Sequence, residues 1–128
     1  MIGFEDRTYR RRKHQRLPIV VLCDISAHDT GEILGKGCVL NYSRGGLAVI
    51  SPAEMAWDSL VNLTVDRLDH EGFITAKIVN SRPVMDGLFS YGIEFDGLNP
   101  LKKIQMERRF KKLFRLLLSS APRTSREF

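Results

Sequence analysis

The chain has 128 residues, of which 43% are hydrophobic and 27% charged, and it carries a formal net charge of +5. A chain of this length most simply forms one domain, and it can bury a core without the help of disulfides or metal. The sequence contains no apolar run near the roughly 20 residues that a membrane-spanning helix needs and no apolar signal-peptide stretch near its N-terminus, so we expect a cytoplasmic protein.

Six short segments rich in β-branched and other apolar residues predict strands. They cover residues 17–25, 33–42, 47–51, 60–68, 73–80 and 88–95. Turn-forming residues separate these segments and no helical pattern lies between them. The sequence therefore predicts a mainly β fold, a small six-stranded antiparallel barrel. Trp57, in the loop between the third and fourth strands, is expected to pack into the core.

The period changes to that of a helix after Asn99, which is placed to act as an N-cap, with Pro100 at the first helical position. The expected apolar stripe consists of Leu101, Ile104, Phe110, Leu113, Phe114 and Leu117. The opposite face carries Lys102, Lys103, Arg109, Lys112 and Arg115. We read the first face as packing on the barrel and the second as solvated, while binding of a membrane surface or a partner stays open.

Charge is distributed unevenly along the chain. Residues 7–16 hold six cations and no anion, and residues 102–115 hold seven cations and one anion, whereas residues 17–101 hold eleven anions and five cations. We therefore expect anionic partners at particular places rather than over the whole surface. The predicted parts are a flexible basic leader (1–16), a barrel domain (17–97), an amphipathic helix (98–120) and a disordered tail (121–128).

Residues with catalytic or metal-binding potential are few and scattered. Cys23 and Cys38 lie in apolar stretches, and we read them as reduced core residues rather than as a disulfide or a reactive pair. The three histidines are far apart, and the sequence has no zinc spacing, no phosphate-binding glycine-rich loop and no nucleophile elbow. We therefore predict no catalytic residue, no metal site and no enzymatic activity.

Two short segments combine residue types that bind anions and read guanine. The first, within residues 10–16, contains Arg12-x-x-x-Arg16, and the second is Asn41-x-Ser43-x-x-Gly46. Guanidinium groups match phosphate oxygens or the O6/N7 edge of guanine and stack on purines. A short amide, a hydroxyl and a glycine can fix a base or sugar against a barrel. Each segment alone is also typical of a solvated basic cluster or of a turn.

Together, about 25 residues apart and with a barrel pattern around them, the two segments resemble the motifs of the PilZ domain family. That family has Arg-x-x-x-Arg and Asp/Asn-x-Ser-x-x-Gly, and this sequence matches both at every defined position. The resemblance extends from about Arg10 to Phe95, where residues 91–95 resemble the closing strand of the family. PilZ domains bind the bacterial second messenger cyclic di-GMP, so the resemblance implies a cyclic di-GMP receptor that needs no other cofactor.

The resemblance also implies roles for individual residues. Arg12 and Arg16 would clamp phosphate and stack on or hydrogen-bond guanine. Asn41 and Ser43 would hold the other guanine edge. Gly46 would be the position at which a side chain blocks the ligand.

Further residues near the motifs are weaker candidates. Arg44 and Gly45 occupy variable positions of the second motif, and Gly45 is also explained by the turn alone. Asn80 lies on a strand that faces the pocket in such barrels. Arg11, with Arg10 behind it, would add a contact to a second guanine or phosphate, which favours an intercalated pair of cyclic di-GMP molecules over a single one.

The expected mechanism is a ligand-driven ordering of the arginine-rich leader that changes the surface offered to an unidentified downstream protein. The alternative is a degenerate PilZ adaptor that works through protein contacts and binds no nucleotide. Nucleic acid is not expected as a partner, because the body of the chain is acidic and the basic segments carry few aromatic residues. A homodimer through the C-terminal helix stays open, and so does the number of ligands per chain.

Overall fold

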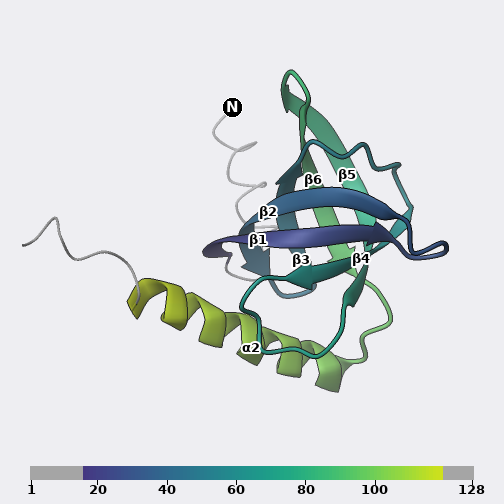
Figure 1. Cartoon of the computed structure of the whole chain (residues 1–128). Helices are drawn as coiled ribbons and strands as arrows, with labels where there is room; N and C mark the ends of the chain where they lie inside the picture. Colours follow the sequence, from purple (N-terminus) through teal and green to yellow (C-terminus); the bar gives the residue numbers. More distant parts are fainter. Residues whose placement is uncertain (1–15, 120–128) are drawn as a thin grey trace, which may run out of the picture.

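The computed structural model describes residues 16–119, which form a closed six-stranded antiparallel barrel followed by one helix (Figure 1). The elements are β1 (Leu17–Ala27), β2 (Ile33–Ser43), β3 (Gly46–Ser51), β4 (Leu60–Val65), β5 (Ile74–Met85), β6 (Leu88–Phe95) and α2 (Pro100–Ser119). The order around the barrel is β1-β2-β3-β6-β5-β4. The predicted fold class is therefore confirmed. No helix in the part of the chain that the structure describes has the length and apolarity to cross a membrane.

Alternation along the strands fills the barrel. In β1 the side chains of Ile19, Val21, Cys23 and Ile25 are buried, while the residues between them are exposed. Each such aliphatic side chain contributes about 1.5–3 kcal/mol by leaving water. Burial also raises the pKa of the Cys23 thiol to about 11, and both cysteines are free thiols. Cys38 is only half-buried, because it pairs with the exposed Leu22 and so belongs to the outer face.

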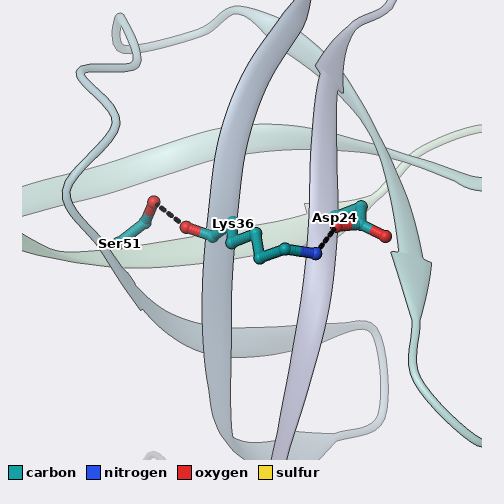
Figure 2. A network of polar contacts seen from close by, with 3 residues as sticks. All are labelled: Asp24, Lys36 and Ser51. Atoms are coloured by element: carbon teal, nitrogen blue, oxygen red, sulfur yellow. Dashed lines mark hydrogen bonds and ion pairs between the residues drawn. The ribbon is translucent and has the colours of Figure 1, made fainter.

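Short polar contacts join β1, β2 and β3 around Lys36 (Figure 2). Asp24 and Lys36 are cross-strand partners, and Lys36 Nζ donates to Asp24 Oδ1 at 2.6 Å. Both side chains are mostly exposed, so solvent screens the pair and it adds little to stability. The hydroxyl of the fully buried Ser51 donates to the carbonyl of Lys36 at 2.6 Å and accepts from the amide of Ala53. Ser51 thus satisfies its polar group where β3 ends.

Four strands end at different residues from those predicted, and the difference is one or two residues in β1 and β2 but larger in β4 and β5. β4 ends at Val65 rather than at residue 68, because Arg67 has a φ of 66° and so cannot continue the strand. β5 runs to Met85 instead of ending at Asn80, since its pairing with β6 continues until Met85 faces Leu88. This extension forms an exposed hairpin that projects from the barrel, at the top of the view in Figure 1.

Helix α2 lies along the barrel in the lower part of the view in Figure 1 and begins at the predicted cap, where Asn99 Oδ1 accepts from the amide of Lys102 at 2.8 Å. Its buried residues are Met106, Phe110 and Leu113. Leu101 and Ile104 were expected on this face but are exposed, so that part of the prediction is wrong. The contacting stripe consists of the buried Met106, Phe110 and Leu113, with Phe114 and Leu117 packed against the core. Trp57 is likewise 72% exposed and does not anchor the core.

The cationic side of α2 is not uniformly solvated either. Arg109 is half-buried and its Nη1 donates to His70 Nδ1 at 2.6 Å, while Lys112 Nζ lies 3.2 Å from Asp69 Oδ2. Both partners belong to the loop between β4 and β5. Both cations therefore contact the loop next to the barrel; the expectation of a solvated face is wrong for the half-buried Arg109, whereas Lys112 stays exposed as predicted.

Candidate functional site

A cleft of about 580 Å³ opens on the outer surface of the barrel, over neighbouring strands β2, β3, β6 and β5. Its size lies within the range of about 300–1,000 Å³ that is usual for ligand pockets. The cleft is lined by Arg16, Asn41, Ser43, Arg44, Gly45, Gly46, Leu47, Ala48, Val79, Asn80, Ser81, Arg82, Ser90, Tyr91, Gly92, Ile93 and Glu94. Every candidate site residue that lies within residues 16–119 is on this list. Arg10, Arg11 and Arg12 lie outside the described residues.

The hollow is produced by a row of cross-strand neighbours with small residues at its centre. Asn41 of β2 faces Ala48 of β3, Ala48 faces Gly92 of β6, and Gly92 faces Asn80 of β5. Outward side chains at these positions lie side by side on a sheet. Because Ala48 and Gly92 carry only a methyl group and a hydrogen atom, the surface between the two asparagines is low, and the amide of Asn80 lies over Gly92.

The second motif alternates between the cleft and the core. Asn41 and Ser43 line the cleft, while Tyr42 between them is 2% exposed and points into the barrel. The Tyr42 ring stacks on Phe110 of α2, with centroids 4.6 Å apart and an interplanar angle of 8°. Burial raises the pKa of the Tyr42 hydroxyl to about 12, so it stays protonated. The position of the two polar side chains is thereby fixed by packing on their inner side.

Asn41 and Ser43 form no side-chain hydrogen bond with any residue in the range 16–119, although both are half-buried. Arg16, just before β1, is exposed and likewise has no ion pair within this range. These groups keep their hydrogen-bonding capacity for another molecule. The site therefore offers a guanidinium, an amide and a hydroxyl at one cleft.

Two glycines shape the turn of the second motif for different reasons. Gly45 has a φ of 101°, a conformation that residues with a side chain rarely adopt, and its carbonyl accepts from the amide of Phe95 at 2.7 Å. Gly46 is buried against β6, and a Cβ atom there would lie 2.1 Å from the carbonyl oxygen of Ile93. The structure thus gives Gly46 a role in strand packing, and its expected role of leaving room for a ligand stays a prediction.

Arg44 connects the motif turn to the helix. Its Nε donates to Glu107 Oε1 at 2.8 Å, and Lys111 Nζ lies 2.9 Å from Glu107 Oε2. Hydrogen bonds from Lys111 and Arg44 hold the pKa of the Glu107 carboxyl below its usual value. Arg44 therefore lines the cleft while one of its donors is held by α2.

Asn80 is positioned by Gly92. Its Oδ1 accepts from the amide of Gly92 at 2.9 Å, beside an irregularity in the pairing of β5 and β6. A Cβ atom at residue 92 would lie 2.5 Å from Asn80 Nδ2, so only glycine lets this side chain lie flat over the strand. The oxygen of Asn80 is thus occupied, and its NH₂ group is the part left to donate to a ligand.

Sequence reasoning missed several polar residues of the cleft, among them Ser81, Arg82, Ser90 and Glu94. Arg82 could have been found, since it lies two residues after Asn80 on the same strand and so faces the same side. Glu94 could also have been found, because Ile93 and Phe95 on either side of it are buried. Ser90 pairs with Arg82 across the hairpin, and that pairing depends on the strand extension that the sequence did not predict.

The fold and the cleft define a small antiparallel barrel with a polar, arginine-bearing outer site. The sequence matches the PilZ domain family over residues 10–112, and the chain belongs to this family. A search among curated proteins found no match.

Solved structures share this fold. The PilZ domain with c-di-GMP of YcgR from Escherichia coli has a TM-score of 0.62 at 18% identity, covering 87% of this chain and 97% of that one. The K. pneumonia MrkH–c-di-GMP complex has a TM-score of 0.58 at 19% identity, covering 86% of this chain and 54% of that one. The PilZ domain of CeSA from a cellulose-synthesizing bacterium has a TM-score of 0.54 at 22% identity, covering 76% and 96%. The chain thus spans about half of MrkH, and these likenesses concern the fold alone.

Proposed function

We propose that this protein is a receptor for cyclic di-GMP and that the ligand binds in the cleft over β2, β3, β6 and β5. The observation that carries the proposal is the convergence of Arg16 with Asn41 and Ser43, residues of two separate sequence motifs, on one cleft. Two solved PilZ structures with a similar fold contain c-di-GMP, which supports the same ligand class here.

The chemistry of the cleft suits this ligand. Cyclic di-GMP carries two phosphate charges and two guanine bases. Arg16 and Arg82 supply guanidinium groups that pair with phosphate oxygens or stack on a base, and each such charge-assisted contact contributes about 1.5–3 kcal/mol. The free amide of Asn80 donates to a phosphate or to an acceptor atom of guanine. Ser43 donates through its hydroxyl.

The leader extends the site in this proposal. Arg12 completes the first motif with Arg16, and Arg10 and Arg11 bring further positive charge next to it in the sequence. Closing this segment over a dianionic ligand becomes favourable when the ligand is present, and the change exposes or covers a surface for a partner. Arg10 and Arg11 would also accommodate a second, intercalated ligand, and a calorimetric stoichiometry of one ligand per chain would remove that part of the proposal.

The downstream partner in this proposal is a protein with an acidic surface. Helix α2 packs on the barrel through Met106, Phe110 and Leu113, and its outward side includes the exposed Arg108 and Arg115. Exposed apolar residues on the helix are Leu101, Ile104, Leu116 and Leu118. Neither of the two arginines forms an ion pair within residues 16–119. The arginines of two copies meeting through this face would repel each other, so charge complementarity favours an acidic partner over the homodimer considered from the sequence.

The competing function is an adaptor that binds protein and no nucleotide. The two functions separate in a calorimetric titration with cyclic di-GMP of the wild-type protein, Arg16→Ala and Ser43→Ala. Arg108→Ala is the matched control, because it removes one exposed arginine that does not line the cleft. We expect saturable binding by the wild type and the control, and no measurable binding by Arg16→Ala with an unchanged circular dichroism spectrum. Wild-type protein that takes up no cyclic di-GMP would support the adaptor.

A further inference from the structure

The cleft contains one carboxylate, that of Glu94, which is unexpected in a site for an anionic ligand. Glu94 is the one acidic residue among the residues that line the cleft. It points outward from β6, because its neighbours Ile93 and Phe95 are buried in the barrel. A negative charge here repels the phosphates of a cyclic dinucleotide, so its presence calls for a compensating interaction.

The surroundings of Glu94 leave its carboxylate free. On one side its strand partner is Gly46, which has no side chain to cover it. On the other side its partner is Lys77, whose Nζ lies 3.7 Å from Asp58 Oδ1 instead. Within residues 16–119 the Glu94 side chain forms no hydrogen bond and no ion pair. Both carboxylate oxygens are therefore available to a ligand lying against the motif turn.

The shape of this acceptor matches guanine. The Watson–Crick edge of guanine presents two parallel donors, N1–H and the N2 amino group, and a carboxylate accepts both at once. Adenine presents an acceptor, N1, at the same place, and a carboxylate repels it. The amides in the cleft cannot do this as well, because Asn41 has a single acceptor oxygen and that of Asn80 is already bonded to the amide of Gly92.

We infer that Glu94 is a specificity-determining residue that accepts hydrogen bonds from the Watson–Crick edge of one guanine and so makes the cleft prefer cyclic di-GMP over cyclic di-AMP. This inference rests on the proposed function, since it concerns the base that the same cleft reads. The three arginines that line the cleft, Arg16, Arg44 and Arg82, offset the charge of Glu94 toward the phosphates.

The test is a pair of calorimetric titrations, with cyclic di-GMP and with cyclic di-AMP, of the wild type, Glu94→Gln and Glu94→Asp. Glu94→Gln keeps the size of the side chain and removes one acceptor, and Glu94→Asp keeps the charge and withdraws it from the base. Glu32→Gln is the control, because it removes the same charge at an exposed position outside the cleft.

We expect both Glu94 variants to bind cyclic di-GMP at least about ten-fold more weakly than the wild type, because a contact through two hydrogen bonds to the base is lost. We expect no matching loss of affinity for cyclic di-AMP. If Glu94→Gln binds both dinucleotides more tightly than the wild type, and by the same factor, the Glu94 carboxylate only repels the phosphates. That result would overturn the inference. An unchanged preference in both variants would also overturn it. Wild-type protein that fails to bind cyclic di-GMP would instead refute the proposed function itself.

Discussion

Replacing Gly46 by alanine tests whether the motif glycine serves the barrel or the ligand. The added Cβ would lie 2.1 Å from the Ile93 carbonyl oxygen and 3.3 Å from the Glu94 Cα, both backbone atoms of β6. Backbone atoms of a strand cannot rotate away from the added Cβ as a flexible side chain can, so β3 and β6 must move apart. Such overpacking costs about 1–3 kcal/mol. The hydrogen bond from Phe95 N to Gly45 O, 2.7 Å long, would stretch as well, adding about 1 kcal/mol.

The expected loss for Gly46→Ala is therefore about 2–4 kcal/mol, which lowers the melting temperature of a domain of this size by roughly 10 °C. Thermal unfolding followed by circular dichroism measures it. Gly31→Ala is the control, since its φ of 76° is unfavourable for alanine but its Cβ would meet open space, so we expect a smaller loss of about 1 kcal/mol. If Gly46→Ala has the melting temperature of the wild type, the packing argument is refuted, and the role of this glycine is then in ligand binding.

Three further variants test the packing around the cleft. For Gly92→Ala we expect less than about 1 kcal/mol of destabilisation, because the added Cβ displaces only the Asn80 side chain, together with weakened cyclic di-GMP binding in calorimetry. Phe110→Ala should cost about 3–5 kcal/mol in urea unfolding, since this fully buried ring stacks on Tyr42. Glu107→Gln should be less stable than wild type at pH 7, and this difference should vanish in acid, because the lowered pKa of Glu107 contributes stability only above its titration.

Contrary outcomes for these variants are equally definite. If Gly92→Ala binds cyclic di-GMP as the wild type does, the Asn80 side chain has no part in the site. If the free energy of unfolding of Phe110→Ala lies within about 1 kcal/mol of that of the wild type, α2 is not part of the cooperative core. If the Glu107→Gln difference persists in acid, once the carboxylate is protonated, its origin is not the carboxylate held by Lys111 and Arg44.

The barrel could be predicted because the information for it is local. Alternation along each segment gives the strands, and the turn residues give their antiparallel order. The extent of β5 could not be predicted, because Pro83 reads as a strand breaker. It is tolerated there since β4 pairs only with residues Ile74–Lys77, which leaves the far part of β5 as a free edge.

The candidate site was predictable in its residues but not in its supports. Asn41, Ser43 and Arg16 could be chosen by residue type and spacing, and they line one cleft. The contact of Arg44 with Glu107 joins residues 63 positions apart, and the periodicity of a sequence does not predict contacts between such distant residues. The clash that requires glycine at position 46 depends on β6 lying beside β3, which follows only from the closed order of the strands.

The most direct test of the central claim is the mapping of cyclic di-GMP onto the protein by amide chemical shifts in NMR. We expect the largest changes at Asn41–Ala48, at Asn80 and at Gly92–Glu94, the segments that surround the cleft. A second cavity of about 310 Å³, lined by His70, Phe73 and Arg109 among others, provides the internal comparison. Changes that gather at this second cavity and leave Asn41, Ser43 and Asn80 unaffected would contradict the account.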